Sequence, residues 1–253
     1  VSDFHIVNDD TLKKPAFVEN DELMKFDLVL ANPPYSIKQW DRESFSADKY
    51  GRNFLGTPPQ GRADYAFLQH ILKSLDTKTG RCAILFPHGV LFRDEEREMR
   101  EKLVKSDLVE CVIGIGKNLF FNSPMEACII ICRTEKEHSR KGRVLFINAK
   151  NEVTRKNAES YLEEDHIQKI AQTYINFKEE EGFSSIATIN EILGYGSKLS
   201  IPLYVSGSGS SEDEEVSYTV EEAIDDWLNS SDSFRGSYDI LKQMIFDNGG
   251  DEC

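Results

Sequence analysis

The sequence FDLVLANPPY, residues 26–35, decides the fold, because an apolar run ends there in a turn that contains two adjacent prolines. Residues 26–31 are predicted to form a strand. Each proline lacks an N–H group and holds φ at about −65°, so the chain leaves the strand in a stiff turn with fixed carbonyls. Asn32 adds a side-chain oxygen acceptor and Tyr35 adds a ring face. The stretch predicts a small site for a flat, amine-bearing group at the carboxyl end of a strand.

The same four residues also allow a simpler interpretation. Asn and Pro are common turn residues, so the tetrapeptide could be a β-turn with an aromatic anchor. Short motifs often match by chance, and the choice between the two interpretations depends on the rest of the chain.

Other segments favour the functional interpretation. They are NDDTL at residues 8–12, ADYAFLQHIL at 63–72, GRCAILFPHGVLF at 80–92, NLFFNS at 118–123 and LSIPLYV at 199–205. With these segments in this order, from about residue 8 to about residue 204, the chain resembles the modification (M) subunits of type I restriction-modification systems, which are adenine-specific DNA methyltransferases. The resemblance implies an α/β fold, a partial Rossmann-like fold dependent on S-adenosylmethionine, with a C-terminal helical extension.

The resemblance implies that the turn carries out the chemistry. The expected catalytic residues are Asn32, Pro33, Pro34 and Tyr35. In such enzymes the target adenine is rotated out of the duplex, and the side chain of Asn32 and the carbonyl of Pro33 would hold its N6 amine. Tyr35 would stack on the base.

Two further positions have roles implied by the resemblance. Phe120 is expected to be a second stacking partner for the base, with Phe121 as its alternate. Both phenylalanines could instead be core residues, since Phe is often buried. Asp10 is expected to accept a hydrogen bond from the amino group of the cofactor's adenine, with Asp9 as its alternate. Asp10 could instead cap a turn or a helix.

A glycine-rich loop for the cofactor is missing before Asn32, although similar enzymes place one after their first strand. Residues 114–116, Gly-Ile-Gly, are no substitute, because they lack a third glycine and come after the turn. We therefore expect this chain to be the C-terminal portion of an M subunit and to be inactive on its own.

The formal net charge of −14 is unusual for a protein that binds DNA alone, since such proteins usually have a basic patch. Much of the acidic excess lies at residues 211–215 and 221–226, which we interpret as solvated surface. A candidate phosphate-contacting loop follows the turn and contains Lys38, Arg42, Lys49, Arg52 and Arg62. A charged surface loop is the alternative. The implied partners are double-stranded DNA and separate specificity (S) and restriction (R) subunits.

Other classes of function have little support in the sequence. No apolar stretch approaches the about 18 residues that a membrane helix needs. We find no metal-ligand spacing and expect no metal. Five cysteines without a secretory leader indicate a reducing cytoplasm. His70 and His88 are interpreted as structural rather than as bases.

Strand-like and helix-like segments alternate through the first half of the chain, which favours a parallel sheet with crossover helices. Strands are expected at residues 4–7, 26–31, 82–86, 109–115, 127–132 and 144–147, helices at 63–75, 94–105 and 158–177, and a long loop at 36–62. Residues 1–150 are assigned to the catalytic domain, 151–205 to a helical or irregular extension, 206–218 to a linker and 219–253 to a C-terminal helical segment.

Two alternative functions are kept. A glutamine amide methyltransferase acting on proteins could use the same turn, because a carboxamide nitrogen fits the same acceptors. The long loop and the later helical segment favour the DNA enzyme. The chain could also be a non-enzymatic assembly piece that holds the specificity subunit through its C-terminal helices and binds no cofactor.

Overall fold

The structure is a computed structural model that describes residues 4–120, 125–156 and 159–205. The chain divides into two compact units, Val1–Ser208 and Gly209–Cys253, and all described residues belong to the first. The predicted linker at 206–218 and the predicted helical segment at 219–253 lie outside the described residues.

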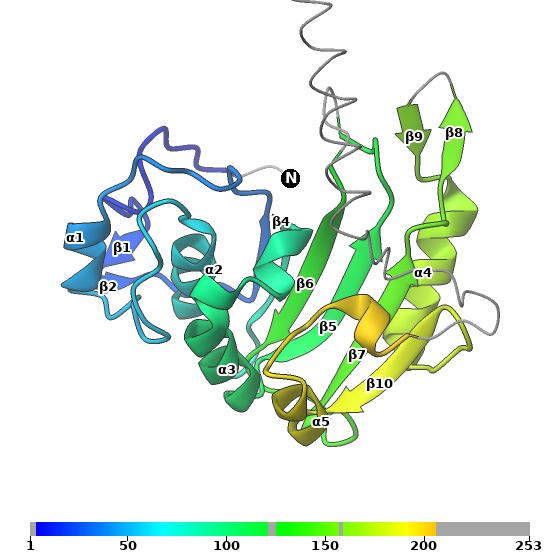
Figure 1. Ribbon diagram of the computed structural model, residues 1–253. Coiled ribbons are helices and arrows are strands. Elements are labelled where there is room, and N and C mark those ends of the chain that lie inside the picture. Colours follow the sequence, from blue (N-terminus) through cyan, green and yellow to red (C-terminus); the bar gives the residue numbers. More distant parts are fainter. Residues whose placement is uncertain (1–3, 121–124, 157–158, 206–253) are drawn as a thin grey trace, which may run out of the picture. The chain divides into compact units, whose positions relative to one another are not determined.

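A six-stranded sheet with the order β10-β7-β5-β6-β4-β3 forms the centre of the first unit (Figure 1). Its strands are β3 (Leu28–Ala31), β4 (Arg81–Pro87), β5 (Val109–Ile115), β6 (Ala127–Arg133), β7 (Arg143–Ala149) and β10 (Ser184–Thr188). The β3–β4 and β5–β7 pairs are parallel, whereas β6 is antiparallel to both of its neighbours and β10 is antiparallel to β7.

The sheet is thus mixed, and the expectation of a parallel sheet is wrong. Strands β5 and β6 pair antiparallel, and antiparallel neighbours need no crossover helix between them; the described part of their connection contains none. The pairing of β10 with β7 joins the segment 151–205 to the segment before it. The division of the chain at residue 150 stays a prediction.

The helices are α1 (Arg42–Ser46), α2 (Asp64–Lys73), α3 (Arg97–Lys105), α4 (Glu164–Asn176) and α5 (Ile189–Gly194), with short 3₁₀ turns at His88–Leu91, Asp94–Glu96 and Ile201–Leu203. Two small hairpins, β1 (Val18–Glu19) with β2 (Glu22–Leu23) and β8 (Thr154–Lys156) with β9 (Glu159–Tyr161), complete the described elements.

Helices α2, α3 and α5 pack on one face of the sheet. Alternate strand residues such as Ile84, Val112 and Phe146 point to this face, where they meet Leu68 of α2 and Leu103 of α3 in one buried cluster. All five of these side chains are almost completely buried. The two-residue side-chain period of the strands therefore builds the main core against a layer of helices.

Helix α4 packs on the opposite face, over β5 and β7. Ile113 and Leu145 point to this side and pack near Ile170 and Tyr174 of α4. Both faces are apolar in these central strands, which is why β5 is an unbroken apolar run apart from Glu110.

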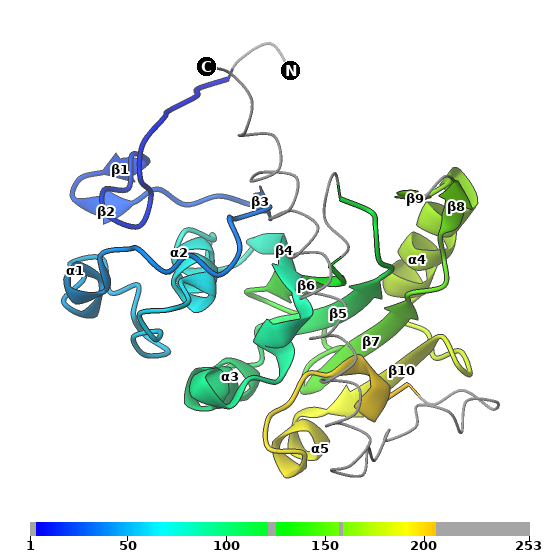
Figure 2. The same cartoon turned by 45° about the horizontal axis from the view of Figure 1, so that its top comes forward.

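Among the strands that the structure describes, β3 forms one end of the sheet and pairs only with β4 (Figure 2). Val29 and Ala31 pack on the main core, whereas Leu28 and Leu30 point away from it and are 51% and 73% exposed. An edge strand with exposed apolar side chains is a site that proteins normally cover.

Three expected elements differ in the structure. Residues 4–7 form no strand, and Phe4 and Ile6 are 74% and 83% exposed. The helix expected at 158–177 begins only at Glu164, because Glu163 and His166 form a reciprocal capping box and β9 occupies the residues before it. The expected long loop at 36–62 contains the short helix α1, which Asp41 caps.

Candidate active site

The turn that follows β3 presents a polar side chain to solvent. Asn32 is exposed and makes no hydrogen bond to a described residue, whereas Pro33 is buried and anchors the turn. Pro34 is exposed and Tyr35 is half-buried. The amide of Asn32 is therefore free to bind a ligand at the carboxyl end of an edge strand, where α/β sheets bind ligands.

Tyr35 offers a ring face rather than a reactive hydroxyl. Its hydroxyl oxygen is buried and lacks a hydrogen-bond partner among the described residues. Burial raises the pKa of Tyr35, and the neighbouring Cys128 adds to the shift. Tyr35 is therefore neutral at ordinary pH and unsuited to act as a base, and its accessible part is an aromatic surface.

Asp64, the first residue of α2, holds the end of this turn. Its Oδ1 accepts a hydrogen bond of 2.8 Å from the backbone N–H of Ser36, and its Oδ2 accepts one of 2.9 Å from Nη1 of Arg93. The side chain of Asp64 is fully buried. Ser36 has a positive φ of 49°, an uncommon conformation for a residue with a side chain. Asp64 thus stabilises a strained turn directly after Tyr35.

This role of Asp64 is not visible in the sequence. An acidic residue in the first turn of a helix is usually explained by the helix dipole, so its presence in ADYAFLQHIL indicates no particular partner. The contact with Ser36 spans 28 positions of sequence. Only the juxtaposition of α2 and the turn after β3 identifies it.

Glu96 lies beside the same ion pair. Its Oε2 is 3.6 Å from Nη1 of Arg93, and its side chain is fully buried. Burial raises the pKa of Glu96 to about 7, with Arg93 opposing the shift and Asp64 adding to it. Two carboxylates therefore share one guanidinium under the turn, and one of them titrates near neutral pH.

Asp10 is at an exposed turn near the start of the described chain. Its Oδ1 accepts hydrogen bonds from the backbone N–H groups of Leu12 at 3.0 Å and Lys13 at 3.1 Å. Asp9 accepts the N–H of Asp10 at 2.8 Å. The capping interpretation of Asp10 therefore holds for one oxygen. The second oxygen, Oδ2, makes no hydrogen bond to a described residue, so the cofactor role stays a prediction.

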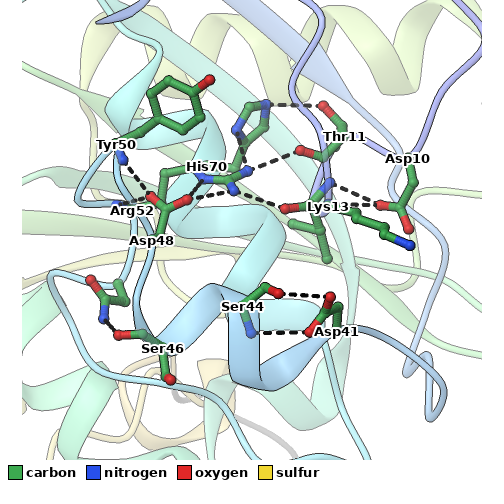
Figure 3. A network of polar contacts seen from close by, with 12 residues as sticks. Asp10, Thr11, Lys13, Asp41, Ser44, Ser46, Asp48, Tyr50, Arg52 and His70 are labelled. Atoms are coloured by element: carbon green, nitrogen blue, oxygen red, sulfur yellow. Dashed lines mark hydrogen bonds and ion pairs between the residues drawn. The ribbon is translucent and has the colours of Figure 1, made fainter. Parts of the chain in front are cut away.

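Arg52 is buried under this turn rather than available to DNA (Figure 3). Its guanidinium donates to the carbonyls of Thr11 and Leu12 at 2.9 and 2.8 Å and to Oδ1 of Asp48 at 2.7 Å. Only 2% of the residue is exposed. The prediction that Arg52 contacts phosphate is therefore wrong. A sequence cannot distinguish an arginine that binds carbonyls from one that binds phosphate, since both acceptors suit its donors.

The other basic residues of this segment differ in their partners. Lys49 pairs with Asp21 at 3.3 Å and Arg62 with Glu95 at 3.4 Å. Arg42 donates to the carbonyl of Pro58 at 2.8 Å and keeps its charge unneutralised by an acid among the described residues. Lys38 is exposed, and its ammonium has no partner among them. Arg42 and Lys38 are thus the two without an acidic partner among the described residues, and a phosphate contact by Lys49 or Arg62, whose ion pairs are exposed, stays a prediction.

Phe120 packs beside the smaller core cluster of β5, β6 and β7 and is partly buried. Its stacking role stays a prediction, and Phe121 lies outside the described residues. His88 follows β4, and burial lowers its pKa. Its Nδ1 is 3.9 Å from Oε2 of Glu126, and its Nε2 is buried without a partner in the described part of the chain.

Three other observations bear on the kind of site. Within residues 4–120, 125–156 and 159–205, no group of three or more His, Cys, Asp or Glu side chains is placed to hold a metal. The described cysteines, Cys82, Cys111, Cys128 and Cys132, are buried free thiols. Among the helices that the structure describes, none is both long and apolar enough to span a membrane.

Comparison with known proteins connects this site to a family. Residues 1–213 match the family model described as N-6 DNA Methylase. The chain is 35% identical to the type I restriction enzyme MjaVIII methylase subunit of Methanocaldococcus jannaschii, over 78% of this chain and 35% of that protein. It is 33% identical to the type I restriction enzyme HindI methylase subunit of Haemophilus influenzae, over 85% of this chain and 48% of that protein.

A solved structure agrees with the sequence comparison. The type I restriction-modification system methyltransferase subunit from Streptococcus thermophilus superposes with a TM-score of 0.72 at 33% identity, over 79% of this chain and 42% of that one. The chain therefore spans less than half the length of each of these relatives. The α/β fold class is that of methyltransferase subunits of this kind, as the sequence predicted, although the sheet is mixed rather than parallel. The chain belongs to the N-6 DNA Methylase family.

Proposed function

We propose that this chain forms the base-binding side of a type I restriction-modification DNA methyltransferase, which transfers a methyl group from S-adenosylmethionine to N6 of adenine. The observation that carries the proposal is the exposed Asn32 amide, free of hydrogen bonds to described residues, at the carboxyl end of β3. The family membership of the chain supports it.

The geometry of the turn suits an exocyclic amine. The Asn32 side-chain oxygen and the Pro33 carbonyl would accept the two hydrogens of N6, which leaves the nitrogen lone pair directed at the electrophile. S-adenosylmethionine supplies that electrophile as a methyl group on a sulfonium. The N–C bond would form as the C–S bond breaks, the sulfonium would leave as a neutral thioether, and the methylated amine would then release one proton to solvent.

Tyr35 would offset part of the cost of extracting the base. Rotating an adenine out of the duplex costs a few kcal/mol, and aromatic stacking returns about 1–3 kcal/mol per base. The neutral, half-buried ring of Tyr35 fits this role. Phe120 is proposed as the second stacking residue.

The residues of this chain fit one end of the cofactor. The free Oδ2 of Asp10 is an acceptor for the amino group of the cofactor's adenine, while its Oδ1 caps the turn. No glycine precedes Gly51 in the sequence, so the chain offers no glycine-rich loop before Asn32. We propose that another part of the enzyme contributes that loop, and that this chain alone binds cofactor weakly and has negligible activity.

Partners follow from the same proposal. Double-stranded DNA is the substrate, a specificity subunit recognises its sequence, and a restriction subunit belongs to the same system. The buried free thiols suit a reducing cytoplasm as the compartment. An acidic chain suits this division of labour, because most of the DNA contact would come from the specificity subunit.

The decisive experiment measures methyl transfer by the complete enzyme that contains this chain, with duplex DNA and a glutamine-bearing protein offered separately. We expect methylation of DNA at N6 of adenine and its loss in Asn32→Ala. The control Asn176→Ala, at the exposed end of α4, should retain activity. Methylation of the protein substrate alone, or full activity of Asn32→Ala, would refute the proposal.

Calorimetry separates this proposal from a purely assembling role. Titration of S-adenosylmethionine into the complete enzyme should show binding, whereas titration into this chain alone should show little or none. A complete enzyme that binds no cofactor would support the assembly function instead.

A further inference from the structure

Helix α2 contacts both of the turns assigned to the reaction. Its first residue, Asp64, binds the backbone of Ser36, next to the Asn32–Tyr35 turn. Six residues later, His70 contacts Thr11, next to Asp10. At 1.5 Å per residue these two contacts are about 9 Å apart along the helix axis. A single rigid element therefore joins the proposed base site to the proposed cofactor site.

At the first contact, the carboxylate of Asp64 is held on both sides. Oδ1 receives the Ser36 N–H at 2.8 Å, and Oδ2 receives the Arg93 guanidinium at 2.9 Å. The Ser36 hydroxyl adds a longer contact to Oδ2 at 3.5 Å. Because the side chain is fully buried, it has no water to replace these partners. The first residue of α2 therefore fixes the position of Ser36, where the chain leaves the turn.

At the second contact, a buried guanidinium and an imidazole hold the chain after Asp10 (Figure 3). Nε2 of His70 is 3.2 Å from Oγ1 of Thr11, and Nδ1 of His70 is 3.4 Å from Nη1 of Arg52. An arginine can only donate, so the ring proton lies on Nε2 and is donated to Thr11. Arg52 also binds the carbonyls of Thr11 and Leu12.

Asp48 completes this second contact. Its Oδ1 accepts two hydrogen bonds from the Arg52 guanidinium, at 2.9 and 2.7 Å. Its Oδ2 accepts hydrogen bonds from the backbone N–H groups of Tyr50 and Arg52. The Asp48 side chain is only 5% exposed. Burial lowers the pKa of His70 to about 4, so the imidazole is neutral at pH 7 and the guanidinium meets no second cation.

We propose that Asp64, His70 and Arg52 are positioning residues that use α2 to fix the distance between the Asp10 carboxylate and the Asn32 amide. The inference rests on the proposed function, since it assigns the cofactor to one turn and the target base to the other. Methyl transfer needs the acceptor nitrogen in line with the methyl group, and misplacement by about 1 Å can cost about 100-fold in rate. Tight fixation of both turns to one helix would meet that requirement.

A purely structural network would behave differently. Loss of a stabilising contact lowers the amount of folded enzyme, and activity per folded molecule stays the same. Loss of a positioning contact changes one kinetic parameter of the folded enzyme. Because the two contacts serve different ligands, variants at the two ends of α2 should affect different parameters.

The kinetic test uses the complete enzyme that contains this chain, with active molecules counted by cofactor binding. Asp64→Asn should lower kcat by about 10- to 100-fold with KM for S-adenosylmethionine within about twofold of the original. Arg52→Lys, which cannot span both carbonyls and Asp48, should raise that KM by about tenfold with a small change in kcat. Lys105→Gln, which removes an exposed pair with Glu101 on α3, is the matched control and should change neither.

Hydrogen exchange of the unsubstituted chain gives a second measurement that needs no variant to fold. Three backbone amides report on the two turns: that of Ser36, which donates to Asp64, and those of Leu12 and Lys13, which donate to Asp10. If α2 holds both turns, these amides should open together with the amides of α2 and exchange at similar rates. Independent exchange of the two turns would overturn the inference. The inference would also be overturned if the loss of activity in both variants were fully explained by a smaller amount of folded enzyme.

The outcome also separates the inference from the proposed function. If Asn32→Ala abolishes methylation while Asp64→Asn and Arg52→Lys have unchanged kcat and KM, the proposed function stands and the positioning role of α2 is refuted. If Asn32→Ala keeps full activity, the proposed function itself fails.

Discussion

The carboxylate of Asp64 accepts the backbone N–H of Ser36 at 2.8 Å, across 28 positions of sequence. This bond ties the residue after Tyr35 to the first turn of α2. Since Ser36 has a positive φ, the turn would be expected to relax without such a partner. The shape of the proposed base site therefore depends on a residue that makes no contact with the base.

Tyr35 should act through its ring alone. Tyr35→Phe removes a buried hydroxyl that has no partner among the described residues, so we expect unchanged or slightly higher stability, by about 1 kcal/mol, and nearly unchanged methylation. Tyr35→Ala removes the stacking surface and should weaken binding of an extrahelical adenine by about 1–3 kcal/mol. Thermal unfolding and 2-aminopurine fluorescence in a duplex would measure these effects. Equal losses in both variants would assign the role to the hydroxyl.

Lys38 should contribute to DNA binding through its charge. Its ammonium is exposed and unpaired among the described residues, so Lys38→Gln in the complete enzyme should reduce the slope of log affinity against log salt by about 1. Lys49→Gln should have a smaller effect, because Lys49 already pairs with Asp21. Affinity titrations at several salt concentrations provide the measurement, and an unchanged slope for Lys38→Gln would exclude a phosphate contact.

His70 should make stability depend on pH. Burial and Arg52 lower its pKa from 6.5 to about 4, so the unfolded chain binds more protons between these values. The contribution of His70 is present above pH 6.5 and decreases as the pH falls towards 4, by at most about 3 kcal/mol. Urea unfolding of the original chain and of His70→Gln across this range gives the difference. If the difference in unfolding free energy between the original chain and His70→Gln does not vary with pH, the imidazole of His70 is not kept neutral by burial.

Glu96 should have the opposite pH dependence. Burial raises its pKa from 4.5 to about 7, so the folded chain binds more protons between these values and loses stability as the pH rises through 7. Glu96→Gln removes this loss. We expect little change at pH 4 and a gain of up to about 3 kcal/mol at pH 8, measured by the same unfolding series. A Gln variant that is less stable at pH 8 would show that the ion pair with Arg93 dominates.

Most strands and helices could be predicted because their patterns are local. The apolar runs of β5 and β6 and the helical spacing of α2 and α3 agree with the predicted positions to within a few residues. The antiparallel direction of β6 was not predicted, because strand direction depends on the path of the connection rather than on side-chain alternation. The helix predicted at 158–177 was too long, because the capping box at Glu163 starts it later than its apolar period indicates.

The candidate site also has features that the sequence predicts and features that it does not. The order of residues 26–35 predicts a strand followed by a stiff turn, and the exposed Asn32 agrees with this prediction. The contrast between Arg52 and Lys38 was invisible in sequence, since both are basic residues of one loop. Arg52 is buried because the carbonyls of Thr11 and Leu12, some 40 positions earlier, surround its guanidinium.

Local chemistry in the chain was sufficient to specify the proline-braced turn, the apolar faces of the strands and the family. The folded arrangement alone decided which charged groups are free and which are bound to backbone, and it alone placed α2 between the turns at Ser36 and Thr11. The physical reason is that turn stiffness and side-chain period depend on neighbouring residues, whereas the partner of a buried charge is set by distant segments that meet only in the folded chain.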